Sequence, residues 1–142
     1  MKLYVVAVGK LKDRAYRSLA DDYLQRIARY ARVQEIEVRG PAELATAAPA
    51  AATTVALEVT GEALTSPELA RRVQRWGSQG KGDIAFFIGG AEGLPEDLSK
   101  RASARLSLSR LTLPHRLARV VLLEQLYRSL TISRGEPNAR ED

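Results

Sequence analysis

Hydrophobic and polar positions along this chain switch between two kinds of pattern. Continuous apolar runs at 3–8 and 83–88 stop at glycines and predict fully buried strands. Alternating runs at 33–38 and 53–59, and a shorter one near 105–109, predict three further strands, each half-buried. Between these runs the apolar spacing changes to three and four residues, which is typical of helices.

The first helical pattern lies between residues 13 and 32. Its apolar positions form one buried face: Tyr16, Leu19, Ala20, Tyr23, Leu24, Ile27 and Tyr30. Ser66-Pro67-Glu68 predicts a second helix, with Ser66 as its N-cap, and Pro95 begins a short third one. The alanine-rich stretch 42–52 is consistent with one weak helical turn or with a loose connection.

The last helix, predicted from about His115 to Ile132, is apolar over far more than one stripe. A helix of this kind must be packed on two sides. Two interpretations remain open: the helix lies at the two-fold interface of a homodimer, or it is a central helix in the core of the monomer.

Strands and helices alternate throughout the chain. This order predicts an α/β fold with a mainly parallel sheet that is covered by helices on both faces. The 142 residues suit one domain, 1–142, and no linker or internal repeat divides them.

Composition excludes several classes of protein. The chain has no cysteine and a single histidine, so neither a disulfide framework nor an intrachain metal centre is expected. No apolar run is long enough for a signal peptide or a membrane span. We therefore expect a soluble, cytoplasmic protein without metal.

The net charge is +5 and the pI is about 9.8. Between residues 99 and 135 Glu124 is the only acid, against eight bases: Lys100, Arg101, Arg105, Arg110, Arg116, Arg119, Arg128 and Arg134. This imbalance indicates either contacts with the phosphates of a nucleic acid or a general bias toward arginine codons.

Two polar turns follow predicted strands. Gly89-Gly90 ends the strand at 83–88, and the segment from Ser109 to His115 follows the strand near 105–109. Paired glycines allow a ligand or another backbone to come close, because they carry no Cβ. Open α/β sheets bind ligands beyond the carboxyl ends of their strands, so the two turns predict one crevice.

Three motifs, in this order, resemble one known family. They are Phe-Ile-Gly-Gly-Ala-Glu-Gly-Leu at 87–94, Ser-Leu-Ser-Arg-Leu-Thr-Leu-Pro-His at 107–115 and Leu-Leu-Glu-Gln-Leu-Tyr-Arg at 122–128. Together with the opening Met-Lys-Leu-Tyr-Val-Val-Ala-Val-Gly-Lys, they resemble the SPOUT-class ribosomal RNA large subunit methyltransferase H family over essentially the whole chain.

The resemblance implies a homodimer whose C-terminal part forms a deep trefoil knot around S-adenosylmethionine. It also implies methylation of N3 of a pseudouridine in the 23S ribosomal RNA of assembled ribosomes. Carried over by position, the cofactor-binding residues are Leu57, Gly90, Ser109, Arg110, Leu111, Thr112, Leu113 and Pro114. The residues on the substrate side are His115 and Arg140.

The implied reaction is a direct displacement in which the nucleobase nitrogen attacks the sulfonium methyl group, so the enzyme mainly positions the two reactants. The N3 proton must leave, and Glu92 and His115 are the candidate bases. Each has a structural alternative: Glu92 can order the glycine turn, and His115 can simply begin a helix. The catalytic residues therefore stay open.

The tail departs from the family pattern. The family usually ends in Pro-Tyr-His-Arg/Lys, whereas this chain has Pro137-Asn138-Ala139-Arg140. An aromatic ring and an imidazole are thus missing at positions that the family is thought to use to hold the target nucleotide. This departure favours an alternative, a catalytically weak or inactive homologue that binds S-adenosylmethionine and RNA. A third hypothesis, a nucleotide-binding regulatory domain without RNA, is disfavoured by the arginine-rich segment.

Overall fold

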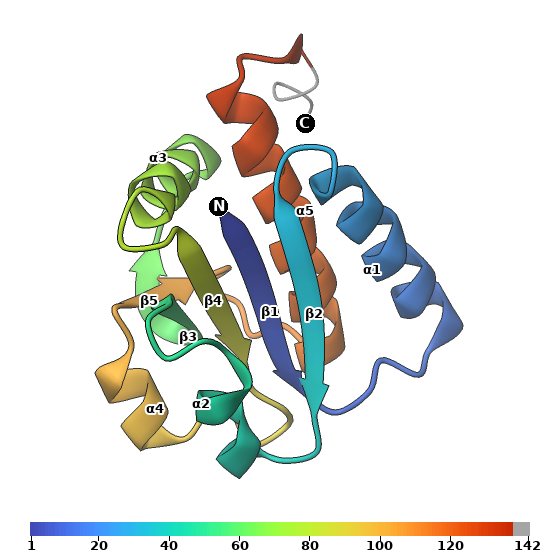
Figure 1. Ribbon diagram of the computed structural model, residues 1–142. Coiled ribbons are helices and arrows are strands. Elements are labelled where there is room, and N and C mark those ends of the chain that lie inside the picture. The colour runs from blue at the N-terminus through green and yellow to red at the C-terminus, as the bar shows by residue number, and fades with distance from the viewer. Residues whose placement is uncertain (138–142) are drawn as a thin grey trace.

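The computed structural model describes residues 1–137 and contains one five-stranded sheet (Figure 1). The strands are β1 (Lys2–Val8), β2 (Arg32–Val38), β3 (Thr53–Ala63), β4 (Asp83–Ile88) and β5 (Ala104–Ser107). They lie in the order β2-β1-β4-β3-β5, and every neighbouring pair is parallel. The predicted α/β class and parallel sheet are confirmed.

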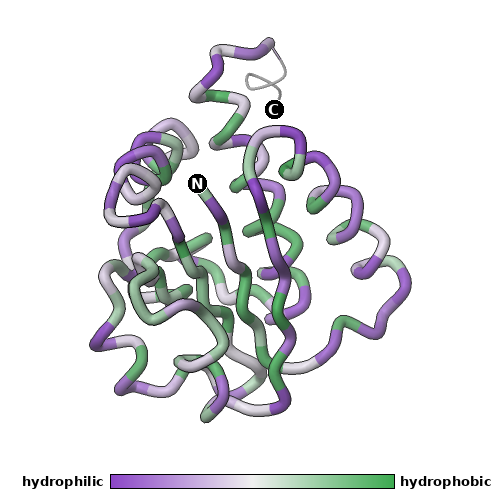
Figure 2. Tube along the Cα trace, viewed as in Figure 1, coloured by the Kyte–Doolittle hydropathy of each residue, from purple (hydrophilic) through white to green (hydrophobic). Residues whose placement is uncertain are grey.

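Helices cover both faces of this sheet. Three long ones pack on one face, α1 (Arg14–Ile27), α3 (Ser66–Gly77) and α5 (His115–Ser133), and enclose the larger hydrophobic core. The shorter α2 (Leu44–Ala47), preceded by the 3₁₀ turn Pro41–Glu43, and α4 (Glu96–Arg101) lie on the opposite face over the smaller core. Figure 2 shows hydrophobic residues concentrated along the central strands and along α5.

Helix α5 lies between α1 and α3 and also touches the sheet. These neighbours bury its residues Leu122, Leu123 and Leu126 completely. Of the two interpretations, a central helix in the monomer core accounts for its apolar character. The homodimer stays a prediction.

The start of α3 corrects one prediction. Its N-cap is Thr65, because the Thr65 hydroxyl accepts a bond from the Glu68 N–H and the Glu68 carboxylate accepts one from the Thr65 N–H. This reciprocal pair is a capping box, in which the acid lies three positions after the N-cap. Ser66, expected as the N-cap, is the first helical residue instead.

Strand β3 differs most from its prediction, since it continues past residue 59 to Ala63. Leu57 and Glu62 both pair with Leu106, so residues 58–61 bulge out of the ladder with β5. At Gly61 an added Cβ would lie 2.7 Å from the backbone carbonyl carbon of Arg105. The glycine therefore lets this bulge lie directly against β5.

Two helix predictions change slightly. Helix α1 ends at Ile27 rather than near residue 32, because the chain tightens into a turn before β2. Its expected buried face is largely confirmed, although Leu19 is exposed.

Within residues 1–137, no helix is both long and apolar enough to cross a membrane.

Candidate active site

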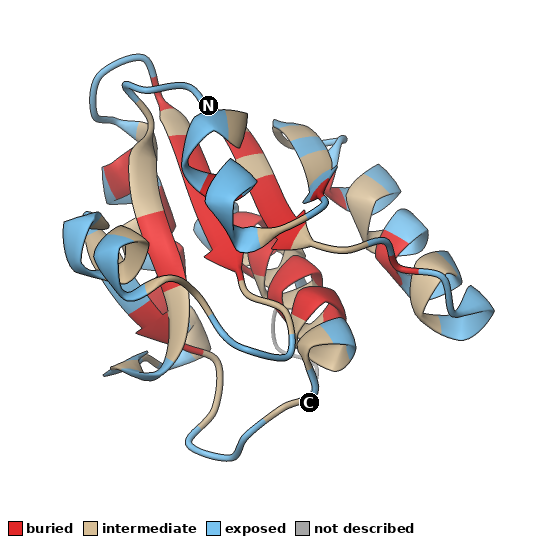
Figure 3. Ribbon diagram, turned by 90° about the horizontal axis from the view of Figure 1, so that it is seen from below, coloured by how far each residue is buried: buried red, intermediate tan, exposed pale blue. Residues whose placement is uncertain are grey.

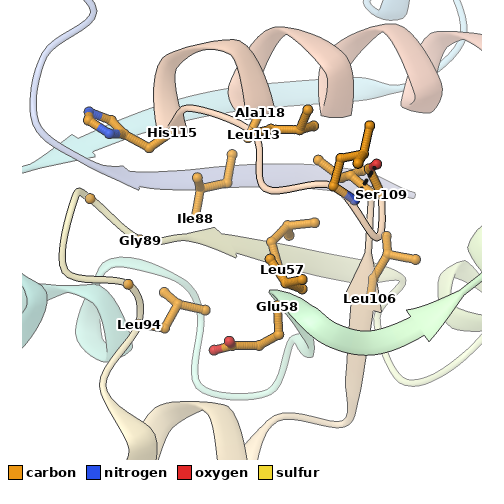
Figure 4. Close-up of a pocket in the computed structure, with 15 residues that line it drawn as sticks. Leu57, Glu58, Ile88, Gly89, Leu94, Leu106, Ser109, Leu113, His115 and Ala118 are labelled. Carbon is orange, nitrogen blue, oxygen red and sulfur yellow. Dashed lines mark hydrogen bonds between the residues drawn. The ribbon is translucent and has the colours of Figure 1, made fainter.

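A pocket opens at the bulge of β3 and the carboxyl ends of β4 and β5 (Figure 4). The bulge, the glycine turn after β4 and the segment after β5 meet there. The pocket is open to solvent on one side and is lined by residues of both motif segments. Seen from this end of the sheet, the central strands are buried and the connecting loops are exposed (Figure 3). The predicted crevice between the glycine turn and the segment 109–115 is therefore present.

Most of the pocket wall is apolar. Its lining residues are Leu57, Glu58, Val59, Ile88, Gly89, Gly90, Gly93, Leu94, Leu106, Leu108, Ser109, Leu111, Leu113, His115 and Ala118. An apolar pocket with a few polar groups is the usual form of a site that binds a small organic molecule.

The glycine turn after β4 forms one wall, and Gly89 is its most constrained position. An added Cβ at Gly89 would lie 2.4 Å from the backbone carbonyl carbon of Gly93 and 2.7 Å from the Leu94 nitrogen. At Gly90 a Cβ would only touch Val8, at 3.5 Å. The missing Cβ at Gly89 thus allows the backbone of Gly93 to pack directly against it. Both glycines line the pocket.

The segment between β5 and α5 forms the opposite wall. The Ser107 hydroxyl donates to the Ser109 carbonyl at 2.8 Å, and the Leu111 N–H donates to the Ser109 hydroxyl at 2.9 Å. These local bonds fix the turn. Leu111 is 76% exposed at the rim, so an apolar ligand surface could cover it.

The sequence-predicted residues separate into three groups. Leu57, Gly90, Ser109, Leu111, Leu113 and His115 line the pocket. Arg110, Thr112 and Pro114 lie on the same segment but do not contribute to the wall. Arg140 lies outside the described residues.

The two candidate bases differ in position. His115 is the first residue of α5 and lines the pocket, whereas Glu92 is exposed at the tip of the glycine turn and does not line it. Among residues 1–137 no side chain caps α5, whose first turn, with His115 and Ala118, borders the pocket.

Glu58 is a pocket residue that the sequence analysis missed. It is the only acidic residue among the described residues of the lining, and Figure 4 shows its carboxylate extending toward the side formed by Leu94. Its place directly after Leu57, which the family resemblance assigns to the cofactor, was the signal that could have identified it.

A buried ion network lies beside the pocket. The Arg119 side chain is 3% exposed and pairs with Glu37 and with Glu35, the latter at 3.1 Å. It also donates to the carbonyl of Gly9 at 3.0 Å, and Arg17 binds Glu35 at 2.6 Å. Arg119 directly follows Ala118 of the pocket wall, so the network fixes the first turns of α5.

The network perturbs Glu37. Burial alone would raise the pKa of this carboxyl group, but the bond from the Leu11 N–H and the neighbouring Arg119 outweigh it. The net effect holds the Glu37 pKa below its usual range.

The basic residues of the segment 99–135 therefore differ in their roles: some form ion pairs inside the fold and others are exposed. Arg119 is structural, and Arg128 pairs with Glu124 at 2.7 Å, as an i,i+4 pair. Arg110 and Arg116 are exposed close to the pocket.

Among residues 1–137 no His, Asp and Glu side chains gather in a group of three that could hold a metal ion.

Comparison with known proteins places this geometry in a family. A family model described as predicted SPOUT methyltransferase matches residues 1–138. A ribosomal RNA large subunit methyltransferase H from Sorangium cellulosum is 54% identical to this chain over 144 residues, covering 98% of this chain and 99% of the relative.

Two solved structures share the fold. A probable methylase family protein from Haemophilus influenzae superposes with a TM-score of 0.62 at 10% identity, covering 99% of this chain and 70% of that protein. The SpoU methyltransferase AviRb from Streptomyces viridochromogenes, solved in complex with AdoMet, superposes with a TM-score of 0.50 at 12% identity, covering 94% and 61%.

Proposed function

Because the chain belongs to the SPOUT methyltransferases and to their ribosomal RNA large subunit methyltransferase H group, we propose that it methylates N3 of a pseudouridine in 23S ribosomal RNA. S-adenosylmethionine is the methyl donor of this family, and the assembled ribosome is the proposed substrate. The observation that carries the proposal is the pocket formed by the motif segments 87–94 and 107–115.

The residues of this pocket fit the chemistry of S-adenosylmethionine. Leu57, Leu106 and Leu113 offer an apolar slot of the kind that an adenine ring occupies. The Glu58 carboxylate is an acceptor for hydroxyl or ammonium groups, and it is opposite in sign to a sulfonium. The uncapped first turn of α5 offers N–H donors of the kind that a carboxylate prefers.

When bound, the cofactor supplies a methyl group to a nucleobase nitrogen in a direct displacement that leaves neutral S-adenosylhomocysteine. The residues of the pocket position the reactants, and the apolar walls exclude water from the reacting centre. His115, within the lining, is the better placed of the two candidate acceptors for the N3 proton, since Glu92 lies outside the wall. Exposed Arg110 and Arg116 are suited to RNA phosphates near the rim.

We further propose a homodimer in the cytoplasm, with one domain per chain and with a trefoil knot in the C-terminal part. The order β4-β3-β5 at one side of the sheet, and the return of the chain from edge strand β5 to the central helix α5, support the knot. The exposed rim residues Val59 and Leu111 support a partner surface beside the pocket.

One observation favours a second candidate function. Asn138 and Ala139 replace the tyrosine and histidine that are usual in the family, and this replacement supports a homologue that binds cofactor and RNA but transfers methyl groups weakly. Arg140 of the same tail stays a proposed substrate contact.

Transfer of labelled methyl groups from S-adenosylmethionine to purified 70S ribosomes tests both candidates. The natural chain should label the large-subunit RNA, with the double variant Asn138→Tyr/Ala139→His as its matched comparison. No transfer by the natural chain, with cofactor still bound and activity gained in the variant, would support the binding homologue. No binding of cofactor by either chain would contradict the proposed function.

A further inference from the structure

A second hollow lies on the other side of the β3 bulge from the cofactor pocket. It is bordered by β3, α3 and the segment leading into β5. Its lining residues are Thr60, Gly61, Glu62, Arg72, Arg75, Trp76, Ala102, Ser103, Ala104 and Arg105. Nothing in the proposed methyl-transfer chemistry uses this hollow.

Three arginines against one acid give the hollow a positive balance. Arg72 is neutralised by Glu62, because its two terminal nitrogens each donate to a carboxylate oxygen at 2.8 Å. Arg75 is exposed and forms no ion pair within residues 1–137, and Arg105 gives one bond to the Ser99 carbonyl at 3.2 Å. Two guanidinium groups therefore keep most of their donors for a ligand.

The walls of the hollow are fixed by the backbone. Gly61 brings the bulge directly against Arg105, which an added Cβ would prevent. On the other side, Ser103 and Thr54 join the segment before β5 to β3, with the Ser103 N–H donating to the Thr54 hydroxyl at 3.0 Å. The backbone around the hollow is thus already ordered before a ligand binds, and this lowers the entropic cost of binding.

The chemistry of the hollow selects its ligand class. Paired guanidinium groups bind phosphate oxygens well, because their N–H donors match the oxygens in geometry and charge. The lining of the hollow is mostly polar and offers little surface on which a base could stack, which suits a phosphate on a continuous strand better than a free nucleotide. Its polar lining offers little apolar surface to a protein segment.

The position of the hollow points to the same ligand. The bulge presents Glu58 and Val59 to the cofactor pocket, and Thr60 and Gly61 to the second hollow. In an extended strand, residues two apart are separated by about 7 Å. A strand whose target base enters the first pocket would therefore lay a neighbouring phosphate over the bulge.

We propose that Arg75 and Arg105 bind a backbone phosphate of the RNA strand next to the nucleotide being methylated. This inference rests on the proposed function, because it takes the substrate to be RNA. It adds a contact that positions the strand and carries no sequence information of its own.

The test compares the double variant Arg75→Gln/Arg105→Gln with Arg14→Gln/Arg29→Gln, which removes the same charge from two exposed positions, the first residue of α1 and the turn just after its last residue. For methylation of 70S ribosomes, the first variant should raise KM about tenfold and leave kcat and the affinity for S-adenosylmethionine unchanged. Its binding should also depend less on salt, with the slope of log K against log salt smaller by about 0.7, the value for one phosphate of a single strand.

Equal KM values and equal salt slopes for the two double variants would overturn the inference. A loss of cofactor affinity in the Arg75/Arg105 variant would also overturn it, because the effect would then come from the shared bulge. If the natural chain transfers no methyl group, the proposed function fails separately. Salt-dependent cosedimentation of the same variants with ribosomes then decides the role of the hollow.

Discussion

Replacing Gly89 by alanine should distort the cofactor pocket more than any other single-methyl change in the glycine turn. The added Cβ would lie 2.4 Å from the Gly93 carbonyl carbon, so one backbone segment must move by about 1 Å to restore normal contact. Because the atoms that must move are backbone atoms, the loss of folding free energy should lie at the upper end of the range for overpacked sites, about 2–3 kcal/mol. For a chain of this length, the midpoint of thermal unfolding should fall by about 6–9 °C.

The same movement displaces Gly93 and Leu94, which line the pocket. The Gly89→Ala variant should therefore bind S-adenosylmethionine at least tenfold more weakly, as measured by calorimetry at a temperature where both proteins are folded. Gly90→Ala is the matched control for stability, because its Cβ only touches Val8 at an ordinary distance. If Gly89→Ala keeps both the unfolding temperature and the affinity of the natural chain, the close approach deduced here is wrong.

The remaining predictions concern charge and capping. Glu58→Gln should weaken S-adenosylmethionine about fivefold more than it weakens S-adenosylhomocysteine in calorimetry, because only the first ligand carries the sulfonium and a partly exposed carboxylate near one cation contributes about 1 kcal/mol. Arg119→Met should lower the free energy of urea unfolding by about 2 kcal/mol, since it removes the buried cation that Glu35 and Glu37 share and leaves Arg17 as their remaining partner among the ion pairs of the network. The lowered pKa of Glu37 means that its stabilisation is complete above the ordinary pKa of about 4.5 and is lost as pH falls through the folded value. Glu37→Gln should therefore reduce stability at neutral pH and flatten its decline in acid, and an unchanged acid profile would contradict the shift. Thr65→Ala should cost about 1 kcal/mol in the same unfolding assay, because it removes the N-cap of α3.

The fold was predictable where a local pattern determines the element. The apolar runs ending at Gly9 and Gly89 gave β1 and β4, and alternation of strands and helices gave the parallel sheet. The path of β3 beyond Val59 was not predictable, because the bulge depends on its pairing with β5, more than forty residues away in sequence. The N-cap of α3 could have been predicted from the sequence, since Thr65 and Glu68 have the spacing of a capping box.

The site was predictable to the extent that motif segments form it. The glycine turn and the segment from Ser109 to His115 meet as expected, and Leu57 lies with them. The alternation that turns Arg110 and Thr112 away from the pocket depends on the local bonds of Ser109, which a pattern does not give. The ion network around Arg119 could not be predicted either, because Glu37, a partner of Arg119, is 82 residues away in the sequence.

The most direct test of the account is to identify the nucleoside that this protein modifies. 70S ribosomes that lack the modification are incubated with the natural chain and labelled S-adenosylmethionine, and the digested large-subunit RNA is analysed by mass spectrometry. The account predicts label in a single pseudouridine, as the N3-methyl nucleoside. Label on a ribose hydroxyl, on another base or in the small subunit would contradict it.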